Sequence, residues 1–81
     1  MSTSSQPAVV LDARGLNCPE PLMLARNALR PLAAGAVLEI SATDPSTVRD
    51  FEQLCRFLGH DLLAADETGG VYHFRIRKGG G

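Results

Sequence analysis

Along this chain, segments in which apolar residues have the spacing of a strand are interrupted by segments in which they have the spacing of a helix. The order of these segments limits the possible folds more than any other feature of the sequence. Apolar and polar residues follow the short, alternating pattern of strands over residues 9–13, 36–42, 61–66 and 71–77. Between the first and second segments, and again between the second and third, apolar residues recur every three or four positions, as on one helix face. The order β-α-β-α-β-β with right-handed crossovers predicts an α+β fold. We expect a two-layer α/β sandwich in which a four-stranded mixed sheet carries two helices on one face.

Both expected helices carry start and stop signals. The first begins near Pro19 and ends at residue 29 or 30, because Pro31 would remove a backbone donor from a continuing helix. The second begins at Asp44-Pro45, an N-cap followed by proline at the first helical position, and ends at Gly59. The residues expected to face the core from the second helix are Val48, Phe51, Leu54, Cys55 and Leu58.

The last two strands are expected to form a hairpin through the turn at residues 67–70. In the final strand Tyr72, Phe74 and Ile76 alternate with polar residues and should face the helices. The opposite face of the sheet should be polar and solvated. Its expected residues are Glu39, Ser41, His73, Arg75 and Arg77.

Length and charge limit the classes of protein that this chain can belong to. Its 81 residues predict one domain over residues 8–78, after a disordered leader at 1–7 and before a flexible glycine tail at 79–81. A net charge of −1 argues against direct nucleic-acid binding, which needs a concentrated positive surface. No segment approaches about 18 consecutive apolar residues, and the N-terminal residues lack the features of a secretory signal. We therefore expect a cytoplasmic monomer that does not enter a membrane.

The two cysteines have different expected roles. Cys55 lies in the apolar stripe of the second helix, which predicts a buried, inert thiol. Cys18 lies between the turn at Gly15 and the start of the first helix, where unpaired N–H groups and the helix dipole favour a thiolate. Pro19 and Pro21 remove donors there, and Glu20 adds a negative charge. We therefore expect an exposed Cys18 whose equilibrium is shifted modestly toward the thiolate.

Several thiol chemistries lack the residues that they need. A dithiol oxidoreductase requires a second cysteine two or three residues away, and none is present. A cysteine hydrolase requires a histidine base, and neither His60 nor His73 can be placed beside Cys18 from the sequence. Two cysteines and two scattered histidines do not give a zinc ligand pattern. The remaining interpretation is a thiol that forms a covalent adduct and transfers the bound group to a partner, without a metal or cofactor.

Four segments of the sequence match one known family. Leu11 to Pro21, LDARGLNCPEP, contains a Cys-Pro-x-Pro motif with a glycine three residues before the cysteine. Asp44-Pro45, the segment from Cys55 to His60 and the segment from Ile76 to Gly80 extend the match. Over about residues 9–80 the chain resembles the TusA/SirA-like sulfur carrier family, most closely its TusA branch. It differs by a longer polar leader and one extra terminal glycine.

The resemblance implies a function and a site. It makes Cys18 the catalytic residue that accepts sulfane sulfur as a persulfide, supported by the motif residues Gly15, Pro19, Glu20 and Pro21. The implied donor is a cysteine desulfurase or a rhodanese-like protein, and the implied acceptor is a cysteine of a downstream protein. The pathway would be tRNA 2-thiouridine synthesis, sulfur oxidation or molybdenum cofactor assembly. Such a protein is a sulfurtransferase in the sense of persulfide transfer rather than a stand-alone enzyme.

Two other functions fit parts of the sequence. The Gly-Gly terminus is shared with carriers that transport sulfur as a C-terminal thiocarboxylate, and an exposed thiol could instead be oxidised in a redox-sensing module. The missing second cysteine favours loading over redox sensing. Arg14 and Arg26 lie near Cys18 in sequence and are the residues we expect to dock a partner protein.

Overall fold

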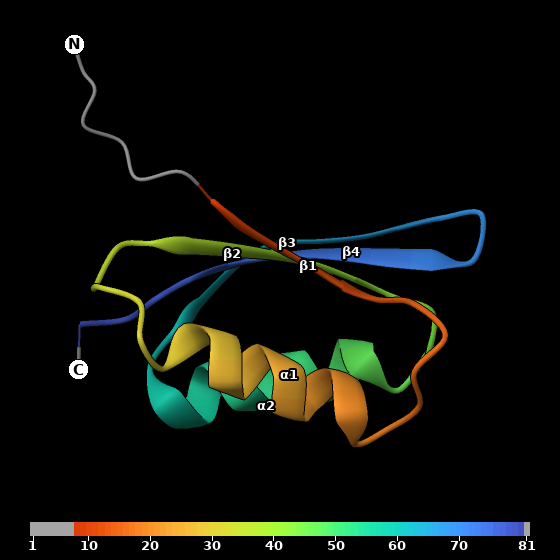
Figure 1. The fold of residues 1–81 in the computed structure, drawn as a ribbon, viewed down its shortest axis with the longest axis horizontal. Coiled ribbons are helices and arrows are strands. Elements are labelled where there is room, and N and C mark those ends of the chain that lie inside the picture. Colours follow the sequence, from red (N-terminus) through yellow and green to blue (C-terminus); the bar gives the residue numbers. More distant parts are fainter. Residues whose placement is uncertain (1–7, 81) are drawn as a thin grey trace, which may run out of the picture.

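The computed structural model describes residues 8–80, so the predicted leader at 1–7 and the final glycine lie outside the described residues. The described chain contains the six expected elements in the expected order (Figure 1). They are β1 (Val9–Ala13), α1 (Glu20–Leu29), β2 (Val37–Ala42), α2 (Thr47–Leu58), β3 (Asp61–Thr68) and β4 (Val71–Arg77). Within the described chain, neither helix is long and apolar enough to cross a membrane.

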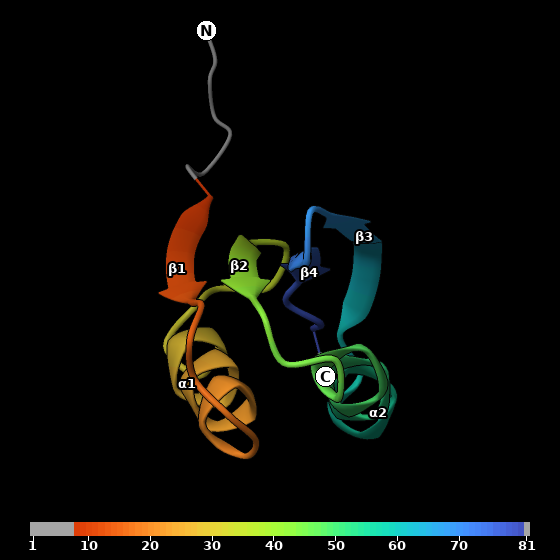
Figure 2. The same cartoon turned by 90° about the vertical axis from the view of Figure 1, so that its right-hand side faces the viewer.

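The four strands form one mixed sheet in the order β1-β2-β4-β3. β1 and β2 are parallel, while β4 pairs antiparallel with β2 and with β3. Both helices lie on the same face of the sheet, α1 against β1 and β2 and α2 against β3 and β4 (Figure 2). The predicted α+β two-layer sandwich is confirmed.

The core lies between the sheet and the two helices. Phe51 of α2 meets Phe74 of β4 edge to face, with ring centroids 4.6 Å apart, in the arrangement that aromatic pairs prefer. Leu38 and Ile40 of β2 are buried beside them, as the alternation of that strand predicts. The other buried apolar residues are Ala13, Ala25, Leu29, Ala36, Ala42, Leu54, Cys55 and Ile76.

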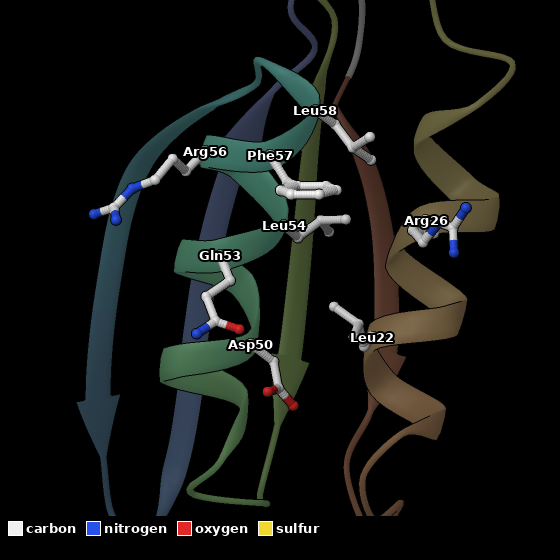
Figure 3. A pocket seen from close by; sticks show the side chains of 8 residues that line it. All are labelled: Leu22, Arg26, Asp50, Gln53, Leu54, Arg56, Phe57 and Leu58. Carbon is white, nitrogen blue, oxygen red and sulfur yellow. The ribbon is translucent and has the colours of Figure 1, made fainter.

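Three element boundaries and one core prediction differ from the sequence analysis. β2 begins at Val37, one residue after its predicted start at residue 36. α2 begins two residues after Pro45, because Asp44 and Pro45 form a turn in which the Asp44 side chain accepts the Ser46 N–H. β3 continues to Thr68, beyond the predicted end at residue 66. Leu58, predicted to be buried, is 44% exposed. It lines the space between the two helices rather than facing the sheet (Figure 3).

The outer face of the sheet is polar, as predicted. Arg75 forms an ion pair with Glu39 across β4 and β2, with 3.2 Å between Nε and Oε2. Ser41 Oγ and His73 Nδ1 lie 3.2 Å apart on the same two strands. These pairs join neighbouring strands, so the basic residues of β4 already have partners on the sheet.

The C-terminal segment is tied to the ends of both helices. Lys78 donates from Nζ to the carbonyl oxygens of Leu29, Arg30 and Leu32 at 2.7, 3.1 and 3.1 Å. The negative end of the helix dipole favours a cation at this position, and the Leu29 carbonyl accepts the Leu32 N–H as well, at 3.0 Å. The Gly79 N–H donates to Nδ1 of His60 at 2.9 Å, just after α2. The first residue of the predicted flexible tail is therefore anchored, and flexibility of the tail beyond it stays a prediction.

Candidate functional site

The loop that carries Cys18 lies beside the loop that leads into α2. Because β1 and β2 are parallel neighbours, both loops leave the same edge of the sheet (Figure 1). The Gly15 N–H donates to Oγ1 of Thr43 at 2.9 Å, and the Cys18 N–H donates to Oδ2 of Asp44 at 2.7 Å. Two hydrogen bonds between residues 26 to 28 positions apart therefore fix the backbone around Cys18.

The turn after β1 depends on Gly15 and Arg14. Gly15 has a φ of +81°, a conformation that residues with a side chain adopt only at a cost. Arg14 folds back onto Asp12, with Nε and Nη2 donating to the two carboxylate oxygens at 2.8 and 2.9 Å. These hydrogen bonds lower the pKa of Asp12 to about 2. Arg14, predicted to dock a partner, is thus engaged within its own strand and turn.

The two prolines of the motif have different surroundings. Pro19 is exposed at the N-cap position of α1 and follows Cys18 through a cis peptide bond. Pro21, in the first turn, is fully buried and anchors that turn against the core. Glu20 is exposed between them. Cys18 is exposed just before the helix, so its thiol is open to an approaching protein.

The Cys18 thiol has an acidic partner that the sequence analysis did not identify. Sγ donates to Oδ2 of Asp50, on the first turns of α2, at 3.4 Å. This hydrogen bond, partial desolvation and the negative charges of Asp50 and Asp44 raise the pKa of Cys18, and the Ser46 hydroxyl only partly opposes them. The predicted modest shift toward the thiolate is therefore wrong. The start of α1 does favour a thiolate, but a carboxylate 32 residues away in sequence outweighs it.

The second thiol is buried. Cys55 lies on the side of α2 that faces the core and is only 4% exposed, and burial raises the pKa of its thiol to about 11. This confirms the expected burial, and a protonated thiol in the core is unreactive. Neither histidine is paired with Cys18, because His60 accepts from Gly79 and His73 pairs with Ser41. Among residues 8–80, no group of three or more histidine, cysteine or acidic side chains is arranged to hold a metal ion.

A groove of about 540 Å³ runs between α1 and α2 and begins at the carboxylate that contacts Cys18 (Figure 3). Phe57 lies along it with 90% of its surface exposed, an unusual position for a large apolar side chain. Arg26, predicted as a docking residue, lines the same groove from α1. The complete lining is Leu22, Arg26, Asp50, Gln53, Leu54, Arg56, Phe57 and Leu58.

The site includes residues that were predicted for other roles or not at all. Asp44 was predicted as a helix cap, and it also accepts the Cys18 N–H. Thr43, Ser46 and Asp50 were not predicted as site residues. The signal for the first two was the parallel pairing of the first two strands, which brings their following loops together. No sequence signal placed the Asp50 carboxylate at the sulfur.

The fold and the site define a class: a small two-layer α/β protein whose one exposed thiol stands at the start of a helix, with the other thiol buried. Comparison with known proteins identifies the family. The family model described as Sulfurtransferase TusA matches residues 9–78. The chain belongs to the TusA family.

Individual relatives agree with this assignment. The chain is 53% identical over 76 residues to the sulfur carrier protein TusA of Pseudomonas putida strain W619, covering 94% of this chain and 95% of that protein. It is 57% identical over 68 residues to the TusA of Pseudomonas entomophila, covering 84% and 85%. The crystal structure of a SirA-like protein from Desulfitobacterium hafniense matches with a TM-score of 0.79 at 26% identity, covering 88% of this chain and 97% of that one.

Proposed function

We propose that this protein carries sulfane sulfur as a persulfide on Cys18. It accepts the sulfur from a cysteine desulfurase or a rhodanese-like donor and passes it to a cysteine of a downstream protein. The observation that carries the proposal is the contrast between the two thiols, since Cys18 is exposed at the end of a fixed loop and Cys55 is buried. Membership of the TusA family supports the same role.

The absence of a second accessible thiol suits a carrier. A persulfide on Cys18 would be discharged as sulfide if a neighbouring thiol of the same chain attacked the inner sulfur and closed a disulfide. In the described chain the other cysteine is buried in the core and cannot make this attack. The sulfur therefore stays on Cys18 until a partner's cysteine attacks the outer sulfur atom.

The partner docks, in this proposal, on the groove between the helices. Its apolar residues Leu22, Phe57 and Leu58 lie beside the cationic Arg26 on the side of the molecule that presents Cys18. Within residues 8–80 Arg26 forms no ion pair, so its charge is available to an acidic group of the sulfur donor. Arg14 remains a proposed docking residue only if a partner competes with Asp12 for its guanidinium.

The downstream pathway follows from the family rather than from any contact in this chain. We propose a relay in the reducing cytoplasm that leads to tRNA 2-thiolation or to sulfur oxidation. The carrier reaches RNA only through other proteins, because its net charge of −1 gives no footprint for phosphates.

Mass spectrometry after incubation with a cysteine desulfurase and L-cysteine tests the proposal. We expect the mass of one sulfur atom to be added, to be removed by reductant, and to be absent from Cys18→Ser. Cys55→Ala is the matched control and should still be loaded, because that thiol is buried. Loading of Cys18→Ser to the wild-type level would overturn the proposal.

The two alternative functions give different results in the same assay. A thiocarboxylate carrier would lose its sulfur when Gly80 and Gly81 are deleted, whereas we expect this deletion to leave loading unchanged. A redox-sensing thiol would gain oxygen on exposure to peroxide but take no sulfur from the desulfurase. Either outcome would replace the persulfide proposal.

A further inference from the structure

The contact between Cys18 and Asp50 distinguishes this thiol from an ordinary exposed cysteine. Sγ of Cys18 donates to Oδ2 of Asp50 at 3.4 Å. The carboxylate comes from α2 and the thiol from the loop before α1, and Asp50 also lines one end of the groove between the helices (Figure 3). It exists only while the sulfur carries a proton, because a carboxylate can only accept.

The other polar groups that act on the sulfur lie in the loop that leads into α2. Asp44 accepts the Cys18 backbone N–H and adds a second negative charge, whereas the Ser46 hydroxyl and the start of α1 favour the thiolate. Glu20 follows two residues later and is exposed. Within the described chain, no cation contributes to the titration of Cys18. The charges that act on the thiol are therefore the carboxylates of Asp50 on α2 and of Asp44 in the loop before it.

Sulfur loading changes what Asp50 faces. A donor persulfide, R–S–SH, gives its outer sulfur to Sγ of Cys18: the donor's S–S bond breaks, a new S–S bond forms on Cys18, and the donor leaves as a thiolate that takes up the proton of the Cys18 thiol. The sulfane sulfur keeps its oxidation state, so no oxidant or reductant is consumed. Sγ now has no proton to donate to Asp50.

The loaded sulfur also carries charge. Persulfides are stronger acids than thiols, so the outer sulfur atom is anionic at neutral pH. An anion on Cys18 is repelled by a carboxylate that had accepted a hydrogen bond from the thiol, and Asp44 adds to this repulsion. The outer sulfur is accordingly directed away from α2, and its departure restores the hydrogen bond.

We propose that Asp50 is a positioning residue that favours the unloaded form of Cys18: its carboxylate holds the protonated thiol and repels the anionic persulfide, so that the carrier gives up its sulfur readily. The inference rests on the proposed persulfide function and adds a reason for release. A carrier must bind its cargo weakly enough to discharge it, and a carboxylate beside the sulfur achieves this without a second thiol.

Asp50→Asn tests the proposal, because it keeps the size of the side chain and removes its charge. Asp66→Asn is the matched control, since Asp66 is an exposed carboxylate on β3, distant in the fold from Cys18. The first measurement is the rate at which iodoacetamide alkylates Cys18 from neutral to alkaline pH, read on the Cys18 peptide by mass spectrometry. We expect the midpoint to move to lower pH in Asp50→Asn and to stay unchanged in Asp66→Asn.

The second measurement is the equilibrium between the carrier and glutathione persulfide at a fixed ratio of glutathione persulfide to glutathione. We expect the ratio of loaded to unloaded Cys18 to rise about two- to fivefold in Asp50→Asn, the range that exposed charge interactions produce. Asp66→Asn should match the wild type. An unchanged or lower ratio, or an unchanged alkylation midpoint, would overturn the role of Asp50.

These measurements separate the inference from the proposed function. Neither uses a protein donor, so both report on Asp50 even if a cysteine desulfurase transfers no sulfur to Cys18. Failure of desulfurase loading would overturn the persulfide relay and leave the effect of Asp50 on the thiol standing. If the desulfurase loads Cys18 but Asp50→Asn behaves as the wild type, the persulfide relay stands and Asp50 has no part in it.

Discussion

The backbone N–H of Cys18 donates a hydrogen bond to Oδ2 of Asp44 at 2.7 Å and thereby joins the loop before α1 to the loop before α2. The other oxygen of the same carboxylate, Oδ1, accepts the N–H and the hydroxyl of Ser46. One side chain thus holds both the start of α2 and the backbone of Cys18.

Asp44→Ala removes both the hydrogen bond that anchors Cys18 and a negative charge near its thiol, and two different measurements should report these two effects. Without the carboxylate the loop loses its anchor, and we expect the initial rate of loading by a cysteine desulfurase to fall about tenfold, because misplaced reacting groups lose rate steeply. Alkylation by iodoacetamide should not fall, because a negative charge near the thiol has been removed. The control is Asp66→Ala, for which both rates should equal the wild type. An unchanged loading rate in Asp44→Ala would show that the anchor is dispensable.

Phe51 and Phe57 lie on the same helix, but their replacement by alanine should affect stability to very different extents. Phe51 is fully buried against Phe74, so Phe51→Ala should lower the free energy of unfolding by about 3–5 kcal/mol, a large part of the stability of a small domain. Phe57 is 90% exposed, and Phe57→Ala should change stability by less than about 0.5 kcal/mol. Urea denaturation followed by circular dichroism measures both.

Phe57→Ala also tests the proposed docking groove. Phe57→Ala should raise the KM of a cysteine desulfurase for the carrier while leaving the alkylation rate of Cys18 unchanged, because the ring lines the groove but does not contact the thiol. Glu52→Ala, at another exposed position of α2, is the matched control. An unchanged KM for Phe57→Ala would place the docking surface elsewhere.

Two neighbouring glycines at the C-terminal end should respond differently to alanine. A Cβ at Gly79 would overlap the carbonyl oxygen of Gly59, whereas a Cβ at Gly80 would lie 3.9 Å from Ala34 Cβ, an ordinary contact. Gly79→Ala must therefore displace the segment and break its hydrogen bond to His60, which we expect to cost about 1 kcal/mol. Gly80→Ala should behave as the wild type in thermal denaturation. Equal melting temperatures for the two variants would contradict the anchoring of Gly79.

The fold could be predicted from the sequence because the apolar residues of each strand and helix recur with the spacing typical of that element. The alternation of Leu38 and Ile40 fixes which side of β2 is buried, and the spacing of Leu54 and Cys55, three and four residues after Phe51, does the same for α2. Leu58 was misassigned because periodicity cannot show whether an apolar residue on the edge of a helix faces the sheet or the groove beside it. Exposure at such an edge depends on how the two helices are spaced.

The site could be predicted only in part. Cys18 stood out because its neighbours are a glycine turn and two prolines, which are local features of the sequence. The direction of its titration was predicted wrongly, because it depends on Asp50, 32 residues away. Local rules describe the dipole at the start of α1, whereas a hydrogen bond between the Cys18 loop and α2 depends on how the two segments are placed in the fold. Long-range contacts of this kind are what the structure adds.

His60 should give the protein a pH-dependent stability in the mildly acidic range. Partial burial, with the positive charge of Lys78 nearby, lowers the pKa of His60 below 6.5, and its Nδ1 accepts the Gly79 N–H, which requires an unprotonated nitrogen. Between the folded and unfolded pKa values of His60, the unfolded chain binds more protons than the folded one. The free energy of unfolding therefore rises with pH through this window, and the contribution of His60 is fully present above pH 6.5. Acidification from neutral pH should therefore destabilise the protein. The change should level off below the folded pKa, until carboxylates such as Asp12 titrate at lower pH. Urea denaturation at a series of pH values measures the slope, which we expect to be reduced in His60→Gln and retained in the control His73→Gln. Equal slopes in His60→Gln and the wild type would exclude His60 as the titrating group.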